Sequence, residues 1–143
     1  MSDREPWLQA RAAGRDLLLA TRDLLEVLGP PMVLPMPARP KGIGGVVIHR
    51  GEFLPVLAWE DLPGGPGKPA PPVALAVLGL RLGLPLEGME GTVNLPVAAW
   101  SKPPADDPWE PWIFGVARFE GRAVPGLDLD RLIALLRQFR GQR

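Results

Sequence analysis

Proline and glycine set the strongest limit on how this chain can fold. Its 143 residues include 19 prolines and 17 glycines. Proline breaks the interior of a helix, and glycine adopts the backbone angles that tight turns need. The sequence therefore predicts many short strands joined by turns rather than an all-helical protein. Its length suits one domain, or two small halves that share a core.

The most informative hairpin is predicted at residues 45–59. Residues 46–48 and 53–57 are apolar and would form its strands, with a turn at residues 49–52 in which Gly51 supplies a positive φ. Arg50 would then stand at the tip of a rigid apolar base. A cation in that position is typical of a recognition surface.

Other strands are predicted at residues 7–12, 17–20, 92–97 and 112–119, the last pairing with 123–125, and a second hairpin is predicted at 73–86. Residues 14–16 and 87–91 would be turns, 32–37 an extended segment and 40–45 a flexible approach to the first hairpin. Residues 21–28 are ambiguous. They could form a short helix capped by Thr21, or a strand in which Glu26 faces outward between Leu25 and Val27.

A C-terminal helix is predicted at residues 128–140, with Asp128 as its N-cap and Gly141 as its stop. The proline-rich loop 63–72 would divide the chain into subdomains of roughly 15–65 and 73–127. A second such loop, 101–112, is predicted to be structureless at its centre. Its residues Trp109 and Trp112 would cover an edge of the core rather than anchor a partner.

Composition excludes several kinds of partner and chemistry. Sixteen basic and 16 acidic side chains give no net field to attract nucleic acid or an anionic membrane. The chain has no cysteine, and its longest apolar stretch, 73–86, is too short to span a bilayer. With no visible signal peptide, a cytoplasmic protein is expected. Abundant arginine and proline with a single asparagine suggest a thermophilic source, and a GC-rich genome is the alternative explanation of the arginine and proline.

Catalytic groups are few. His49 is the only histidine, and it is predicted to be a partly exposed turn residue, so no metal, cofactor or enzymatic activity is expected. Asp106 and Asp107 would lie in a flexible loop, and Asp128 would cap the helix. An alternative of a different class remains, in which a small β-barrel binds a ligand or hydrolyses a substrate through Glu87 or Asp128.

Read in order, the motifs resemble the CheW-like family of chemotaxis coupling proteins. The family pattern has a glutamate after an apolar strand, then G-V-x-N-L-R-G and P-V-x-D-L. Here Glu26, residues 45–51 (GVVIHRG) and Pro55-Val56 correspond to it. Residues 82–89, 115–117 and 127–132 resemble the later motifs. The chain departs from the pattern at Ile48, His49, Ala58 and Trp59. It also has Glu87 in place of the aspartate of the second hairpin, with Pro85 in that strand.

The resemblance implies an all-β fold of two five-stranded, barrel-like subdomains around a shared hydrophobic core, with the C-terminal helix against them. It also implies a non-catalytic adaptor that links the cytoplasmic tip of a chemoreceptor to the regulatory domain of a CheA-type histidine kinase. An adaptor of type IV pili or of another signalling system is the alternative. The partner-binding residues expected from it are Glu26, Val47, Ile48, Arg50, Gly51, Val56 and Leu57. The alternative for Arg50 is that it is paired internally and holds the hairpin.

Overall fold

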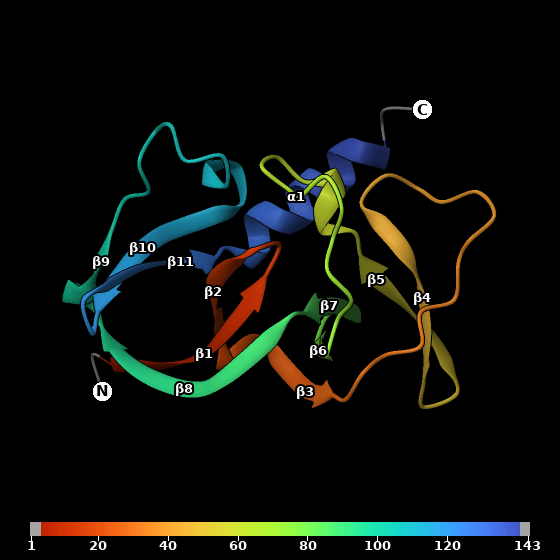
Figure 1. The fold of residues 1–143 in the computed structure, drawn as a ribbon, viewed down its shortest axis with the longest axis horizontal. Coiled ribbons are helices and arrows are strands. Elements are labelled where there is room, and N and C mark those ends of the chain that lie inside the picture. The colour runs from red at the N-terminus through yellow and green to blue at the C-terminus, as the bar shows by residue number, and fades with distance from the viewer. Residues whose placement is uncertain (1–3, 141–143) are drawn as a thin grey trace.

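The structure is a computed structural model that describes residues 4–140. It is an all-β fold, as the sequence predicts, in which two sheets lie side by side and the helix α1 (Leu129–Arg140) lies across their junction (Figure 1). Asp128 caps this helix as predicted, because its Oδ1 accepts the backbone N–H of Arg131 at 3.1 Å. The predicted stop at Gly141 lies outside the described residues.

The first sheet has six strands in the order β8-β1-β2-β11-β10-β9. These strands are β1 (Arg4–Ala12), β2 (Arg15–Ala20), β8 (Gly88–Pro96), β9 (Trp100–Ser101), β10 (Ile113–Phe119) and β11 (Arg122–Leu127). The second sheet has five strands in the order β3-β6-β7-β5-β4. These are β3 (Leu24–Leu28), β4 (Ile43–His49), β5 (Glu52–Leu57), β6 (Ala74–Leu78) and β7 (Leu82–Leu86). Four short 3-10 helices join them within residues 4–140: η1 (Thr21–Asp23), η2 (Trp59–Asp61), η3 (Val97–Ala99) and η4 (Glu110–Trp112).

The two sheets do not follow the division at the loop 63–72 that composition suggested. The five-stranded sheet takes β6 and β7 from beyond that loop, and the six-stranded sheet joins the first two strands of the chain to its last four. Composition located a long connection, but the connection runs between two strands of one sheet. The sheets have six and five strands rather than five each.

The same arrangement of strands occurs in both sheets. In each, a hairpin (β1–β2 or β6–β7) has one parallel contact with a second hairpin (β10–β11 or β4–β5), and a further strand pairs antiparallel with its outer side. The hairpins β4–β5 and β10–β11 have the same length, and each has a register shift near its start. The sequence shows no obvious repeat, so the similar strand order of the two sheets is evident only in the fold.

The core has three parts. One cluster fills the six-stranded sheet, a second fills the five-stranded sheet, and the largest lies between them and α1. Strand β2 serves two clusters, since Leu17 and Leu19 face the shared core and Leu18 faces the interior of its own sheet. Strand β6 does the same. Such strands are buried on both faces, which is why they read as unbroken apolar runs.

The loop 101–112 is ordered by tryptophan, which corrects the expectation of a structureless centre. Trp109 and Trp112 are 1% and 0% exposed, and their ring centroids lie 4.4 Å apart. Their indole N–H groups donate to the backbone oxygens of Gly64 and Pro63 at 3.2 and 3.0 Å. These two bonds hold the loop 63–72 against the core. The expectation that both rings cover the core is confirmed.

Asp107 is also held in place rather than free in a flexible loop. Its carboxylate accepts two hydrogen bonds from the guanidinium of Arg15, at 2.8 and 3.1 Å. The bond from Arg15 is the main cause that lowers the pKa of Asp107, against the opposing effect of burial.

Three local predictions need correction. Residues 21–28, predicted as either a helix or a strand, form η1 followed by strand β3, which confirms the strand for residues 24–28. The predicted side of Glu26 is wrong, because Leu25 and Val27 are exposed while Glu26 is half-buried. The turn predicted at 87–91 is mostly the start of β8, which pairs with β1 past a bulge at Gln9 and Ala10. The approach 40–45 is partly strand, because β4 begins at Ile43. The remaining strands and both predicted hairpins are confirmed within a few residues.

Within residues 4–140, the structure has no helix that is both long and apolar enough to cross a membrane.

Candidate docking surface

The hairpin of β4 and β5 ends in a two-residue turn. His49 pairs with Glu52, and between them Arg50 and Gly51 have φ values of 52° and 78°. Two successive residues with positive φ match the right-handed twist of the flanking strands, which makes this a favoured hairpin turn. The turn holds Arg50 at the tip, where its side chain is 73% exposed.

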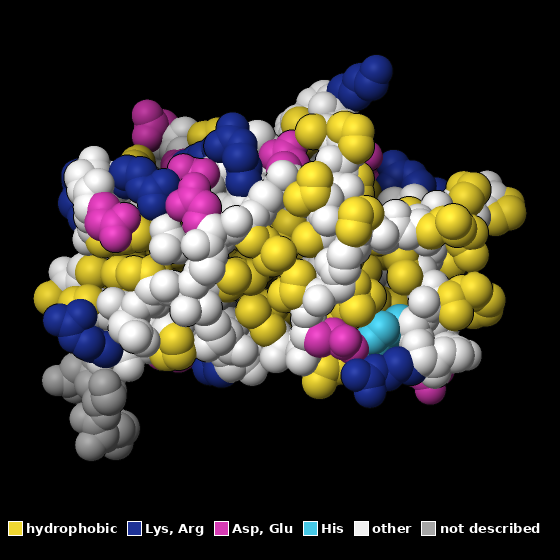
Figure 2. Space-filling model, turned by 60° about the horizontal axis from the view of Figure 1, so that its bottom comes forward, with side chains coloured by type: hydrophobic (Ala, Val, Ile, Leu, Met, Phe, Trp, Pro, Cys, Tyr) yellow, Lys and Arg dark blue, Asp and Glu magenta, His cyan; other side chains and the backbone are white. Residues whose placement is uncertain are grey.

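A network of charged side chains joins this turn to the opposite edge of the five-stranded sheet. Strands β3 and β4 are the two edges of that sheet. Glu26 on β3 binds His49 at the end of β4, with Oε1 and Nε2 2.6 Å apart, and the same oxygen accepts hydrogen bonds from Arg50 Nη2 at 3.1 Å and Nε at 3.3 Å. Glu26 thus links the two edges. Figure 2 shows the histidine in cyan between acidic and basic side chains.

The tautomer of His49 follows from its neighbours. Arg81 Nη1 lies 3.2 Å from His49 Nδ1, and a guanidinium can only donate, so Nδ1 accepts. In the neutral ring Nε2 therefore carries the proton, and this N–H donates a hydrogen bond to Glu26 Oε1. Arg81 also pairs with Glu52 at 3.2 Å. The histidine is a linking residue between a carboxylate and a guanidinium.

His49 is 5% exposed, which corrects the prediction of a partly exposed turn residue. The reason is strand alternation, because His49 is the last residue of β4 and lies on the same face as the buried Val47. The family pattern already indicates a buried side chain at this position, since it has a leucine there.

The pKa of Glu26 lies below its ordinary value. The hydrogen bond from His49 is the largest cause, and it outweighs desolvation, which acts in the opposite direction. The nearby charge of Arg50 and its hydrogen bond lower the pKa further. Glu26 is therefore a stable anion at neutral pH.

Only part of the expected binding set lies at the surface. Val47, Val56 and Leu57 are 6%, 2% and 2% exposed, so their side chains belong to the core behind the surface. Ile48 is 62% exposed and Arg50 is at the tip. The structure places Ile48, Arg50 and Gly51 at or next to the turn of the β4–β5 hairpin, and hydrogen bonds join Glu26 to Arg50 there.

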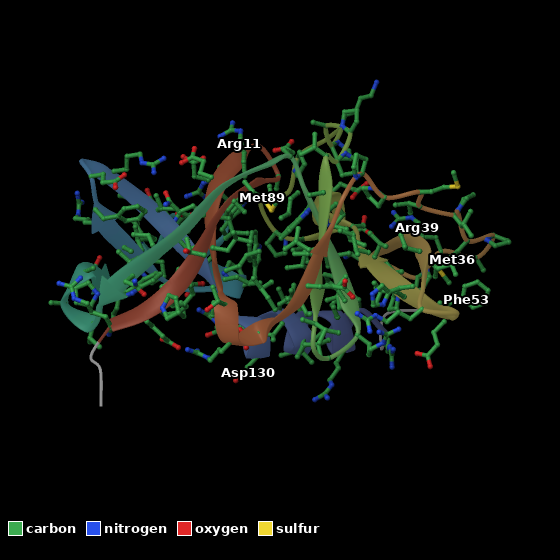
Figure 3. The ribbon with its side chains drawn as sticks, turned by 90° about the horizontal axis from the view of Figure 1, so that it is seen from below. Arg11, Met36, Arg39, Phe53, Met89 and Asp130 are labelled. Atoms are coloured by element: carbon green, nitrogen blue, oxygen red, sulfur yellow. The ribbon has the colours of Figure 1, made fainter. Side chains whose placement is uncertain are left out.

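Sequence reasoning missed the apolar residues that complete this surface. Phe53 pairs with Ile48 across the hairpin and is 72% exposed, and Figure 3 shows its side chain at the edge of the molecule. Met32 is 79% exposed, and with Ile48 it lines a groove of about 450 Å³ between the end of β3 and strand β4. Ile48, Phe53 and Met32 with Glu26 and Arg50 are called the docking surface below. Alternation along β5 would have found Phe53, because successive side chains of a strand point to opposite faces and the next residue, Leu54, is buried.

The two carboxylates considered for hydrolysis have structural roles. Glu87 Oε1 accepts the backbone N–H of Gly14 at 2.9 Å, and Asp128 caps α1. Among residues 4–140, no group of three or more histidine, aspartate or glutamate side chains could hold a metal ion.

Comparison with known proteins gives one family and one fold. The model of the CheW-like domain matches residues 6–137. No curated protein matches the chain. Among solved structures, the chain is similar to the scaffolding protein TtCheW from Thermoanaerobacter tengcongensis, with a TM-score of 0.77 and 19% identity over 90% of this chain and 86% of that chain. That likeness shows the fold alone. The family model spans nearly the whole chain, and the chain therefore belongs to the CheW-like domain family.

Proposed function

We propose that this protein is a non-catalytic adaptor of bacterial chemosensory signalling. It couples the cytoplasmic tip of a chemoreceptor to the regulatory domain of a CheA-type histidine kinase. Membership of the CheW-like domain family supports the adaptor role. The observation that carries the proposal is the exposed pair Ile48 and Phe53, held by a rigid hairpin beside the charged network of Glu26 and Arg50.

The chemistry of the docking surface suits a protein partner. Interfaces commonly have an apolar centre that contributes affinity and a charged rim that fixes orientation. Ile48 and Phe53 supply such a centre. Arg50 uses Nε and Nη2 to bind Glu26, and no bond of its Nη1 is found within residues 4–140. That remaining donor can bind a carboxylate or carbonyl oxygen of the partner.

A binding experiment tests the proposal. The receptor hairpin tip and the kinase regulatory domain are each immobilised, and the affinity of the native protein for each is measured. Ile48→Asp and Phe53→Asp should weaken binding to at least one of them about tenfold or more, because central apolar contacts dominate interface energies. Val73→Asp is the matched control, since Val73 is 51% exposed but lies outside the docking surface.

Two outcomes would contradict the proposal. The native protein could bind neither partner, or Val73→Asp could weaken binding as much as the other two variants. Receptor tips from flagellar and pilus systems, compared in the same assay, assign the signalling system.

A further inference from the structure

A second hollow, of about 500 Å³, lies at the end of the six-stranded sheet and shares no residue with the docking surface. Trp7, Trp100 and Phe114 line it, and their ring centroids lie 4.5–5.4 Å apart. Phe114 is 38% exposed, and Val97 at the edge is 75% exposed. The hollow is therefore lined by an aromatic cluster in which Phe114 is exposed, Trp100 is half-buried and Trp7 is only 3% exposed.

The rim of this hollow is acidic. Four carboxylates, from Glu5, Asp23, Asp128 and Asp130, line it together with one guanidinium, that of Arg22. This excess of negative charge is local, because the whole chain has 16 acidic and 16 basic side chains. A hollow with aromatic faces and an anionic rim attracts organic cations, through the ring quadrupoles and through charge.

Two of the four carboxylates have no side-chain partner within residues 4–140. Glu5 pairs with Arg22, and Asp128 caps α1. No ion pair or hydrogen bond is found for the side chains of Asp23 and Asp130 within residues 4–140. The dipole of α1 explains an acidic residue at Asp130, in its first turn, but not at Asp23, which lies in η1.

The same protein shows which cation fits such a site. Arg15 lies over the ring of Trp109, with its guanidinium carbon 4.2 Å from the ring centroid, and binds the carboxylate of Asp107 at 2.8 Å. An aromatic face and an aspartate there hold one guanidinium between them. The hollow presents the same two kinds of group, but no arginine of the described chain lies over its rings.

We infer that this hollow binds an arginine side chain presented by a partner protein. A free small molecule fits less well, because ligand sites usually enclose most of their ligand and this hollow is open. This site goes beyond the proposed adaptor function and does not depend on it.

The test is an NMR titration of the full chain with a blocked Gly-Arg-Gly peptide, followed through the indole N–H signals. The arginine peptide should shift the Trp7 and Trp100 signals saturably. A matched peptide with citrulline, which is neutral and has nearly the same shape, should not. Free arginine should bind more weakly than the peptide, since its own carboxylate faces the acidic rim.

Paired variants identify the groups that bind the peptide. Asp23→Asn and Asp130→Asn should each weaken binding roughly threefold, as expected for partly exposed charge pairs. Phe114→Leu keeps the apolar volume but removes the ring, and it should weaken binding by about threefold or more. The controls are Asp106→Asn and Phe53→Leu, which make the same changes at exposed positions elsewhere and should have no effect.

Three results would overturn the inference: no saturable shift with the arginine peptide, an equal response to citrulline, or tighter binding of free arginine. Equal losses in the control variants would do the same. The variants Ile48→Asp and Phe53→Asp should bind the arginine peptide normally, so failure here and failure of the adaptor proposal are distinguishable.

Discussion

At the scale of single residues, His49 occupies a position that strand alternation and the family pattern both assign to an apolar side chain. It is compatible with burial because both ring nitrogens are hydrogen-bonded, one to Glu26 and one to Arg81. Through its hydrogen bond, His49 lowers the pKa of Glu26 on another strand.

His49→Leu should raise the pKa of Glu26 toward 4.5, because the bond from His49 is the largest cause that lowers it. A carboxyl group whose pKa is lowered by folding contributes its full stabilisation at pH values above its unfolded-state pKa. This stabilisation is lost as pH falls through the folded-state pKa. The variant should therefore lose less stability on acidification than the native protein. Carboxyl NMR titration and urea unfolding at acidic and neutral pH measure both effects. The pKa of Asp107 serves as the internal control, and an unmoved pKa of Glu26 would contradict the prediction.

Gly51→Ala should destabilise the protein by about 1 kcal/mol, since a side chain at a φ of 78° is strained even where space is free. No atom lies within 4 Å of the added Cβ, so the cost is purely conformational. Gly67→Ala is the control, because Gly67 also has open space but no positive φ. Thermal unfolding compares the two, and equal stabilities would refute the argument.

At the scale of elements, the hairpins β4–β5 and β10–β11 solve the same problem with different residues. Glu120 and Gly121 have φ values of 51° and 73°, close to those of Arg50 and Gly51. Each hairpin also has a proline on its second strand, Pro55 or Pro125, directly opposite a valine. The first turn residue changes from the cation Arg50 to the anion Glu120, so of these two hairpins only β4–β5 has an arginine in its turn.

Trp109→Phe and Trp7→Phe form a matched pair of buried substitutions. Trp109 loses the bond from its indole N–H to Gly64, which should cost about 1 kcal/mol and loosen the loop 63–72. Trp7 loses a donor that has no acceptor in the described part of the chain, so the hydrogen-bond cost there should be absent. Urea unfolding and hydrogen exchange of residues 63–72 test this. A larger loss from Trp7→Phe would contradict it.

Local patterns predicted most elements but not their assembly. Alternation and turn residues found both hairpins, and helical spacing found α1. The residues around Glu26 predict the wrong face of β3 for it, because they do not show that His49, on another strand, binds its carboxylate. The sequence predicts the docking surface only in part, again because local patterns do not show tertiary contacts. The turn signals identify Arg50, whereas the exposure of Phe53 depends on which face of β5 meets the core. The hollow at the six-stranded sheet is lined by residues from eight separate elements, and no local sequence pattern shows that they meet.

At the scale of the whole molecule, the shared core makes the two sheets interdependent. The cluster between them includes Leu17 from the first sheet, Leu84 from the second and Leu132 from α1, all fully buried or nearly so. Neither sheet covers this surface by itself.

Leu132→Ala should therefore destabilise the entire protein, by about 2–5 kcal/mol for a cavity in a packed core. Because the cavity opens where both sheets meet, unfolding should remain a single transition. Urea curves followed by circular dichroism and by tryptophan fluorescence should coincide. Gln138→Ala, at an exposed position of the same helix, is the control. Two separate transitions would show that the sheets are independent.

The order of strands also has a consequence for synthesis. The five-stranded sheet uses a continuous stretch, from β3 to β7, whereas β1 must wait for β8, with Trp7 opposite Val93. On the ribosome the five-stranded sheet can therefore form first. The hairpin β1–β2 has no partner strand at that stage and exposes its apolar face. Long-range pairing of this kind slows folding. We expect the six-stranded sheet to close last, beside a five-stranded sheet whose strands are already paired, and the shared core to form only at that step.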